Sequence, residues 1–195
     1  AWDAEVRARA DLARDLAASS APDAVEEAEE GVVERTHGGA ILRHLQYSTF
    51  EPNISAARDL SPHEKRLIGI AAAESLVDGQ SVIFDSGSTV LEAARAVVSR
   101  KLHLVAVTND LEIAQVLNTG PQVQVHVLGG QLRPGSNTLV GEQVLSAARQ
   151  IRADVLFLGA HAVTDNIVSE TSPEVAAAKR TLMRSANSCR LLVDS

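Results

Sequence analysis

The sequence has few of the residues that stabilise secreted proteins or anchor membrane proteins. It contains one cysteine, Cys189, and only 3% aromatic residues. A single cysteine excludes an internal disulfide framework, and the shortage of aromatics leaves the core to Ala, Val, Leu and Ile. No apolar run approaches the ~20 residues of a membrane-spanning helix, and the first residues, AWDAEVRARADLARDL, are charged rather than apolar. We therefore expect a cytoplasmic protein without a membrane segment.

An excess of positive charge is also missing. The net charge of −7 argues against a chain that coats nucleic acid, but leaves room for a small DNA-reading module on an acidic domain. The six histidines are scattered without the spacing of metal ligands, so we expect neither a metal site nor a cofactor. A chain of 195 residues is long enough for one good core and a small additional module.

The stretch from Ser81 to Val98 is the most informative part of the chain. An apolar run ends at Asp85, a loop of small residues follows (Ser86, Gly87, Ser88 and Thr89), and an Ala-rich amphipathic run comes next. This order predicts a strand, a tight loop and a helix. Small hydroxyl residues before a helix N-terminus suit an anion, so we predict that this loop binds a phosphate. The same residues would also suit a plain strand-to-helix turn with self-capping hydroxyls.

From about Ser61 onward, short apolar runs alternate with helical patterns. Strands are predicted at 81–85, 102–108, 123–130, 153–160 and 189–195, with helices at 61–76, after 89, at 111–117, at 141–151 and at 172–186. Ser61, Pro62 and Glu64 form an apparent capping box at the first helix. Nearly continuous apolar strands between helices predict a doubly wound α/β domain with a mainly parallel sheet.

Ligands of such sheets bind beyond the carboxyl ends of the strands, where the strand order reverses. Several polar or small residues lie at or near these ends, and we predict that the following bind an effector: Asp85, Ser86, Gly87, Ser88, Thr89, Thr108, Asn109, Gly129, Gly130, Glu170, Thr171 and Lys179. Each also has a structural interpretation. Asp85 either accepts sugar hydroxyls or caps a helix, Thr108 and Asn109 bind ligand or cap the next helix, and Gly129 and Gly130 permit close backbone approach. Lys179 either reaches a phosphate or lies on the surface.

Four further residues have candidate roles. Arg133 and Asn137 are candidates for a lid, and His161 adds a titratable group beside the expected pocket. Cys189 is expected to be a buried core thiol rather than a nucleophile.

Seven motifs in order resemble the DeoR family of bacterial sugar-metabolism repressors. They are ERTHGGAI (34–41), EKRLIG (64–69), DSGSTV (85–90), VTND (107–110), LGGQL (128–132), ADVLFLGA (153–160) with EVAAAKRTLM (174–183), and LLVDS (191–195). The resemblance implies a winged helix-turn-helix over residues 1–42, a linker over 43–60 and an effector domain over 61–195. It implies that the effector domain is similar to ribose-5-phosphate isomerase, and that its ligand is a phosphorylated sugar.

The resemblance also implies that Arg35, Thr36, His37 and Gly38, in the wing motif, contact operator DNA, and that the protein is a dimer or tetramer. Residues 21–33, where the recognition helix belongs, depart from the pattern because they contain four glutamates and no Lys or Arg. Either part of that helix is missing from the chain or ordinary DNA binding has been lost. Gly159-Ala160-His161 also departs from the family, which often has a second glycine and an acidic residue there.

The leading hypothesis is a DNA-binding transcriptional regulator, a repressor without catalytic residues, controlled by a phosphorylated sugar. A sugar-phosphate isomerase or deaminase of the same fold class is the alternative, because Asp85, Asp110, His161 and Lys179 could supply an acid and a base. A ligand-binding protein without DNA contact is a third possibility, suggested by the acidic segment.

Overall fold

The computed structural model describes residues 33–36, 39–42, 60–164 and 167–194, and the chain divides into two compact units, 1–51 and 52–195. In the first unit, β1 (Val33–Thr36) and β2 (Gly39–Leu42) form an antiparallel hairpin in which Thr36 is opposite Gly39. The predicted helices of the helix-turn-helix and the predicted linker, at 1–32 and 43–59, lie outside the described residues.

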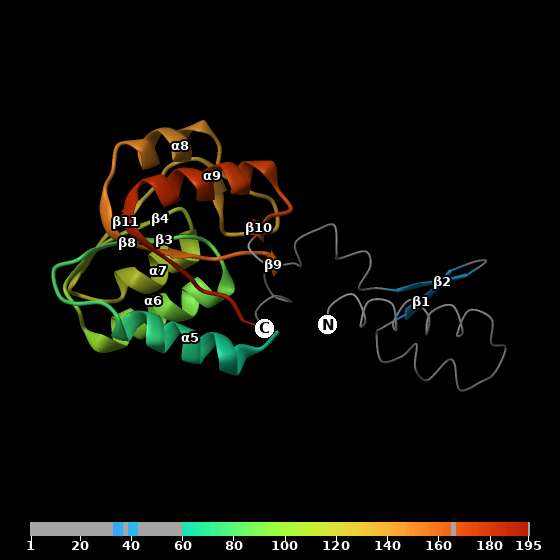
Figure 1. Cartoon of the computed structure of the whole chain (residues 1–195), viewed down its shortest axis with the longest axis horizontal. Helices are drawn as coiled ribbons and strands as arrows, with labels where there is room; N and C mark the ends of the chain where they lie inside the picture. The colour runs from blue at the N-terminus through green and yellow to red at the C-terminus, as the bar shows by residue number, and fades with distance from the viewer. Residues whose placement is uncertain (1–32, 37–38, 43–59, 165–166, 195) are drawn as a thin grey trace. The chain divides into compact units, whose positions relative to one another are not determined.

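The second unit is the predicted α/β domain, built around a five-stranded parallel sheet (Figure 1). Its elements are α5 (Pro62–Glu74), β3 (Ser81–Phe84), α6 (Ser88–Arg100), β4 (Leu104–Thr108), α7 (Leu111–Asn118), β5 (Val123–Val127), β6 (Gln131–Leu132), β7 (Leu139–Val140), α8 (Glu142–Arg149), β8 (Ala153–Leu158), β9 (Ala162–Thr164), β10 (Ile167–Ser169), α9 (Pro173–Arg184) and β11 (Ala186–Leu191). In the part of the chain that is described, no helix is long and apolar enough to cross a membrane.

The helices form a layer on each side of the sheet. Helices α5, α6 and α7 cover one face and α8 and α9 cover the other (Figure 1). Successive residues of a strand point to opposite faces, so Val82 and Phe84 pack under α5 to α7 whereas Ile83 packs under α8 and α9. Both cores are mainly aliphatic, as expected. The rings of Phe84 and Phe157, paired across β3 and β8, meet edge to face with their centroids 5.4 Å apart.

The strand order places one reversal point in the sheet. The order is β11-β8-β3-β4-β5, so the chain proceeds from β3 to β4 and β5 on one side and then crosses to β8 and β11 on the other. A ligand of a doubly wound sheet binds outside the carboxyl ends of the two strands at such a point, here β3 and β8. The residues that follow these strands, from Asp85 and from Gly159, are therefore the candidates for ligand contact.

Three expectations about local structure need correction. Ser61 does precede α5 and Pro62 is its first residue, but Ser61 has φ 47° and its side chain caps nothing, so no capping box forms. The last strand begins at Ala186 rather than Cys189. Cys189 is exposed instead of buried, because β11 is an edge strand with a neighbour on one side only. Two small hairpins, β6–β7 and β9–β10, were not predicted.

Candidate functional site

The carboxyl ends of β3 and β8 are tied together directly. The Asp85 backbone N–H donates to the Phe157 carbonyl at 3.0 Å, and the Gly159 N–H donates to Asp85 Oδ2 at 3.1 Å. A Cβ added to Gly159 would lie 2.8 Å from the Ser86 carbonyl oxygen, so only glycine lets the two loops approach this closely. The Asp85–Thr89 loop and the end of β8 thus form one continuous site at the reversal point.

The loop after Asp85 presents backbone amides at the start of α6. The cap residue Gly87 has φ 131°, which an L side chain rarely adopts, and no side chain caps the helix. The first amides of α6 therefore have no side-chain acceptor of their own and are available for an anion. Gly87 is exposed and Ser88 half-buried, whereas Ser86 and Thr89 are buried. Gly87 and Ser88 are the loop residues that an incoming ligand meets first.

Lys179 reaches this site from α9, but its ammonium group contacts carboxylates. Its Nζ lies 2.5 Å from Asp85 Oδ2 and 3.1 Å from Glu170 Oε1, and it donates to the Gly159 carbonyl at 2.9 Å. Lys179 is only 7% exposed, so the alternative of a surface lysine is wrong. Glu170 follows β10, and therefore Lys179 connects the end of the β9–β10 hairpin to the end of β3.

Two opposing influences set the pKa of Lys179. Burial by itself lowers the pKa, but the charges of Asp85 and Glu170, and their hydrogen bonds to the ammonium, outweigh it and raise the pKa above the ordinary value of 10.5. Lys179 thus stays protonated at neutral pH. Two carboxylates share this one cation, so with both ionised the three side chains have a net charge of −1.

Three buried polar atoms at this edge lack a hydrogen-bond partner among the described residues: Asp85 Oδ1, Asn109 Oδ1 and Thr171 Oγ1. Asp85 and Asn109 lie on neighbouring strand ends, because each directly follows the register pair Phe84–Thr108. Leaving such atoms unpaired is costly, and a hydroxyl-bearing ligand or water would satisfy them. These positions suit a ligand that donates hydrogen bonds.

Thr108 and Asn109 do not cap α7 with their side chains; Asp110 does, accepting from the N–H groups of Glu112 and Ile113. Thr108 Oγ1 accepts from the Asp110 N–H, and Asn109 Nδ2 donates to the Leu139 carbonyl. Thr108 therefore braces the turn that leads into α7, and Asn109 connects the end of β4 to β7.

Other predicted site residues lie farther along the sheet or the chain. Gly129 and Gly130 follow β5, which β4 separates from β3. A Cβ on Gly130 would lie 2.6 Å from the Val140 carbonyl oxygen, which gives Gly130 the predicted role in close packing, whereas a Cβ on Gly129 would meet nothing within 4 Å. The Asn137 side chain donates a hydrogen bond to Glu112, and the Arg133 backbone N–H donates to the Thr138 carbonyl. The candidate lid is therefore held in place by hydrogen bonds to α7 and within its own loop.

The remaining predicted residues are placed as follows. Ser172 is the N-cap of α9 and accepts from the Val175 N–H. His161 is exposed just after β8. Cys189 is exposed at the sheet edge, but partial desolvation and the charge of Asp85 still raise the pKa of its thiol. Arg35 and Thr36 lie on β1, while His37 and Gly38 are outside the described residues. No three His, Cys, Asp or Glu side chains of the described ranges are grouped to hold a metal ion.

Sequence reasoning missed a second buried lysine, Lys65. It is 6% exposed, and its Nζ contacts Asp194 Oδ2 at 2.5 Å and the Leu60 carbonyl. A signal was present in the sequence, because Lys65 lies at helical spacing with the core-facing residues Gly69, Ala72 and Ala73 of α5. A lysine on the buried face of a helix needs a hydrogen-bond or ion-pair partner inside the protein.

Comparisons with known proteins agree with the motifs. Residues 61–195 match the family described as the DeoR C terminal sensor domain. The chain is 32% identical over 169 residues to the HTH-type transcriptional repressor CsqR of Escherichia coli K12, covering 85% of this chain and 62% of that protein. It is 28% identical over 173 residues to the glycerol-3-phosphate regulon repressor of the same strain, covering 88% of this chain and 67% of the relative.

A solved structure of ribose 5-phosphate isomerase A from Methanocaldococcus jannaschii is also similar, with 14% identity and a TM-score of 0.49 over 67% of this chain and 51% of that one.

Proposed function

The chain belongs to the DeoR C-terminal sensor domain family, and on that premise we propose that its α/β domain senses a phosphorylated sugar or polyol. The observation that supports this most is the loop at the reversal point. The uncapped amides at the start of α6 can donate to an anion, while the unpaired acceptors Asp85 Oδ1 and Asn109 Oδ1 can accept from hydrogen-bond donors. A ligand with a phosphate at one end and hydroxyls at the other satisfies both.

We further propose that the protein is a cytoplasmic transcriptional repressor whose affinity for operator DNA changes when this ligand binds. The relatives named above are repressors, and this chain spans 62% of the length of CsqR. In this proposal residues 1–42 bind DNA, with Arg35, Thr36, His37 and Gly38 in the wing, 43–60 is a linker, and 61–195 is the sensor. A two-fold operator calls for a dimer or tetramer.

The proposed effector contacts are narrower than the full predicted set. In this proposal Gly87 and Ser88 contact the phosphate, Asp85 and Asn109 accept hydrogen bonds from ligand hydroxyls, and the unpaired Thr171 hydroxyl forms a further hydrogen bond with the ligand. The other residues of the set hold the site in place without contacting the ligand, because their side chains are buried or contact protein groups. They are Ser86, Thr89, Thr108, Glu170 and Lys179. Gly130 contributes through close packing against Val140 of β7 rather than through ligand contact, and Gly129 is left out of the proposed contacts.

Thermal unfolding with a panel of sugar phosphates, matched free sugars and inorganic phosphate tests the sensor proposal. A ligand at a hundredfold excess over its dissociation constant stabilises the folded state by about 2.7 kcal/mol. We expect stabilisation by one phosphorylated compound and not by its unphosphorylated form. Equal stabilisation by both forms, or none by any phosphorylated compound, would contradict the proposal. Salt-sensitive DNA binding that the same compound alters tests the repressor role.

A further inference from the structure

We propose that the effector is a phosphorylated amino sugar whose protonated amine binds at Asp85; this inference rests on the sensor function proposed above and narrows its ligand class. Two observations at the end of β3 support it. One is the charge of the buried side chains there, and the other is the kind of atom that those side chains leave unpaired.

The buried side chains at the end of β3 have an excess of negative charge. The side chains of Asp85 and Glu170 are 1% and 6% exposed, and both contact the single ammonium of Lys179. The neighbouring charges that act on this ammonium are those two carboxylates. Because two carboxylates share one cation, one negative charge is left over when both are ionised. A buried charge without a counter-ion is costly, and a cation on the ligand would neutralise it.

The unpaired atoms at this edge of the sheet include two that can only accept hydrogen bonds. Asp85 Oδ2 accepts from the Gly159 N–H and from Lys179, whereas Oδ1 has no partner among the described residues. Asn109 Nδ2 donates to the Leu139 carbonyl at 3.2 Å, and this bond orients the amide so that Oδ1 is the unpaired atom. Asp85 and Asn109 are 0% and 1% exposed. The ligand must therefore supply hydrogen-bond donors to both.

An ammonium group suits these two acceptors better than a hydroxyl does. Asp85 and Asn109 directly follow the register pair Phe84–Thr108, on neighbouring parallel strands about 4.8 Å apart. An ammonium has three donors and can bond both acceptors, whereas a hydroxyl has one donor. A hydrogen bond between a cation and a carboxylate is also about twice as strong as one between neutral groups. The excess charge and the unpaired acceptors thus favour the same ligand group.

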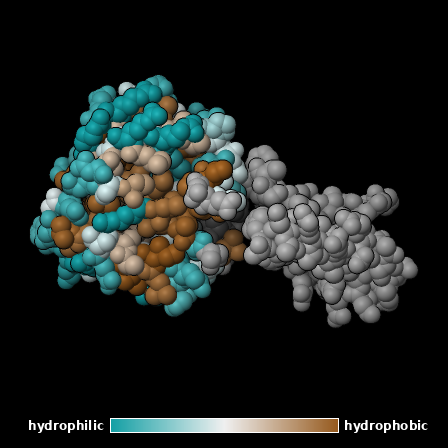
Figure 2. Space-filling view, in the orientation of Figure 1, coloured by the Kyte–Doolittle hydropathy of each residue, from teal (hydrophilic) through white to brown (hydrophobic). Residues whose placement is uncertain are grey.

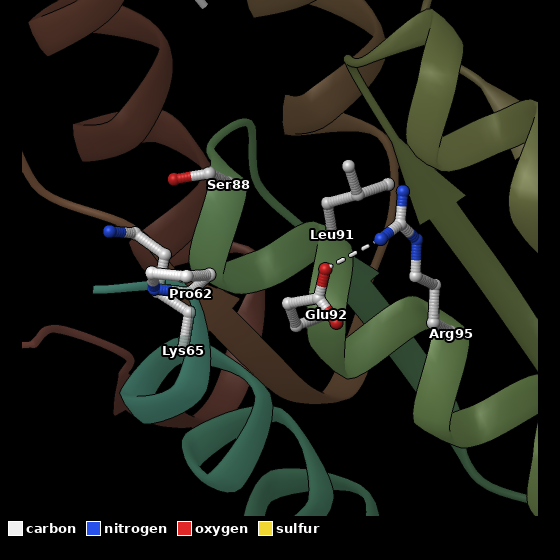
Figure 3. A pocket seen from close by; sticks show the side chains of 6 residues that line it. All are labelled: Pro62, Lys65, Ser88, Leu91, Glu92 and Arg95. Carbon is white, nitrogen blue, oxygen red and sulfur yellow. Dashed lines mark hydrogen bonds and ion pairs between the residues drawn. The ribbon is translucent and has the colours of Figure 1, made fainter. Parts of the chain in front are cut away.

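The phosphate of such a ligand would bind at the other end of the same loop. Ser88 begins α6 and lines a hollow of about 150 Å³ between α5 and α6, where Glu92 already pairs with Arg95 (Figure 3). Asp85 lies three residues before Ser88, so one loop holds both ends of the ligand. A neutral sugar phosphate brings further negative charge to the unbalanced carboxylates, and an amine on the ligand offsets that repulsion.

Matched ligands test the inference directly. Calorimetry at pH 7 would give the affinity of the full chain for the 6-phosphates of glucosamine, galactosamine and mannosamine. The same measurement would be made with the three compounds that have a hydroxyl in place of the amine, and with the three N-acetyl forms. We expect the best amino sugar phosphate to bind at least tenfold tighter than its hydroxyl and N-acetyl counterparts. Equal or tighter binding of either counterpart would overturn the inference.

Glu170→Gln separates the effect of charge from a structural effect. It keeps an oxygen that can accept from Lys179 but removes the excess charge, so the affinity ratio of the amino sugar phosphate to its hydroxyl counterpart should fall at least threefold. Glu174→Gln removes the same charge from an exposed position of α9 and should leave this ratio unchanged. A purely structural role of Glu170 predicts an equal loss of affinity for both ligands, and an unchanged ratio would overturn the inference.

The outcomes also distinguish this inference from the sensor function. If Glu170→Gln did not fold, the comparison of matched ligands on the wild-type chain would decide. Binding of a hydroxyl sugar phosphate without binding of any amino sugar phosphate would leave the sensor function standing and overturn only the amine site. If no phosphorylated compound of either kind bound, both would fail.

Discussion

The Nζ of Lys179 lies 2.5 Å from Oδ2 of Asp85, and this contact joins α9 to the end of β3 inside the protein. Because Glu170 contacts the same ammonium, the lysine also joins the end of the β9–β10 hairpin to the candidate site. These three side chains therefore fix the position of Asp85, the first residue of the Asp85–Thr89 loop. A brown area near β9 and β10 in Figure 2 agrees with the exposed Val163, Ile167 and Val168 of that hairpin.

Removing the shared cation should destabilise the fold. Lys179→Met leaves Asp85 and Glu170 facing each other without a counter-ion, and breaking a buried ion pair in this way costs about 3–5 kcal/mol. Urea unfolding at pH 7 measures the loss. Lys101→Met, at an exposed lysine, should change the unfolding free energy little. Adding Asp85→Asn to Lys179→Met should cost less than the sum of the two single losses; simple additivity would show that the pair is not coupled.

The same contact predicts an alkaline pH dependence. The pKa of Lys179 is raised in the folded state, so its stabilisation is fully present below the ordinary value of 10.5 and is lost as pH rises through the higher folded value. The difference in unfolding free energy between the wild type and Lys179→Met should be constant from neutral pH to the ordinary pKa of 10.5. It should fall as the pH then rises through the higher folded pKa. A difference that already declines below pH 9 would contradict this assignment.

An acid dependence is expected at the other end of β3. Asp154 accepts from the Ser81 N–H at 2.8 Å and from the Ser81 hydroxyl at 2.7 Å, and these bonds lower its pKa from the ordinary 3.8. The stabilisation is present above pH 3.8 and is lost as pH falls through the lower folded value. Asp154→Asn should therefore be less stable than the wild type at pH 6, and this difference in unfolding free energy should disappear in acid. A difference in unfolding free energy that does not depend on pH would show that the Asp154 carboxylate is not its cause.

The glycine at the α5–α6 contact provides a packing test. Gly69→Ala places a Cβ 2.5 Å from backbone of α6 and must push the helices apart, with an expected loss of about 1–3 kcal/mol. Gly129→Ala is the matched control, since its Cβ would meet nothing within 4 Å. Thermal unfolding compares the two. Equal stability of the Gly69→Ala variant and the wild type would mean that the helices do not approach at this residue.

Much of the fold could be predicted because strands β3 and β8 are continuous apolar runs between helical patterns. The β9–β10 hairpin was missed although Asp165-Asn166, a pair typical of turns, separates the β-branched residues Val163 and Ile167. Cys189 was placed wrongly because an apolar pattern does not reveal which strand lies at the edge.

The candidate site was only partly predictable for a similar reason. Strand ends could be identified one by one, so Asp85 and Ser88 were found. The partners of each lysine depend on contacts between residues far apart in the chain, such as Lys179 with Asp85 or Lys65 with Asp194. No local pattern contains that information, which is why Lys179 was expected to face a phosphate and Lys65 was overlooked.

The central claim is that a phosphorylated ligand binds outside β3 and β8, and an amide-resolved NMR titration tests it most directly. Labelled protein would be titrated with the phosphorylated compound that stabilises it and, separately, with the unphosphorylated form. We predict that the amide signals of Gly87, Ser88 and Thr89 shift most with the phosphorylated form and remain nearly still with the other. Shifts confined to other parts of the domain, such as the loop after β5, would contradict the account.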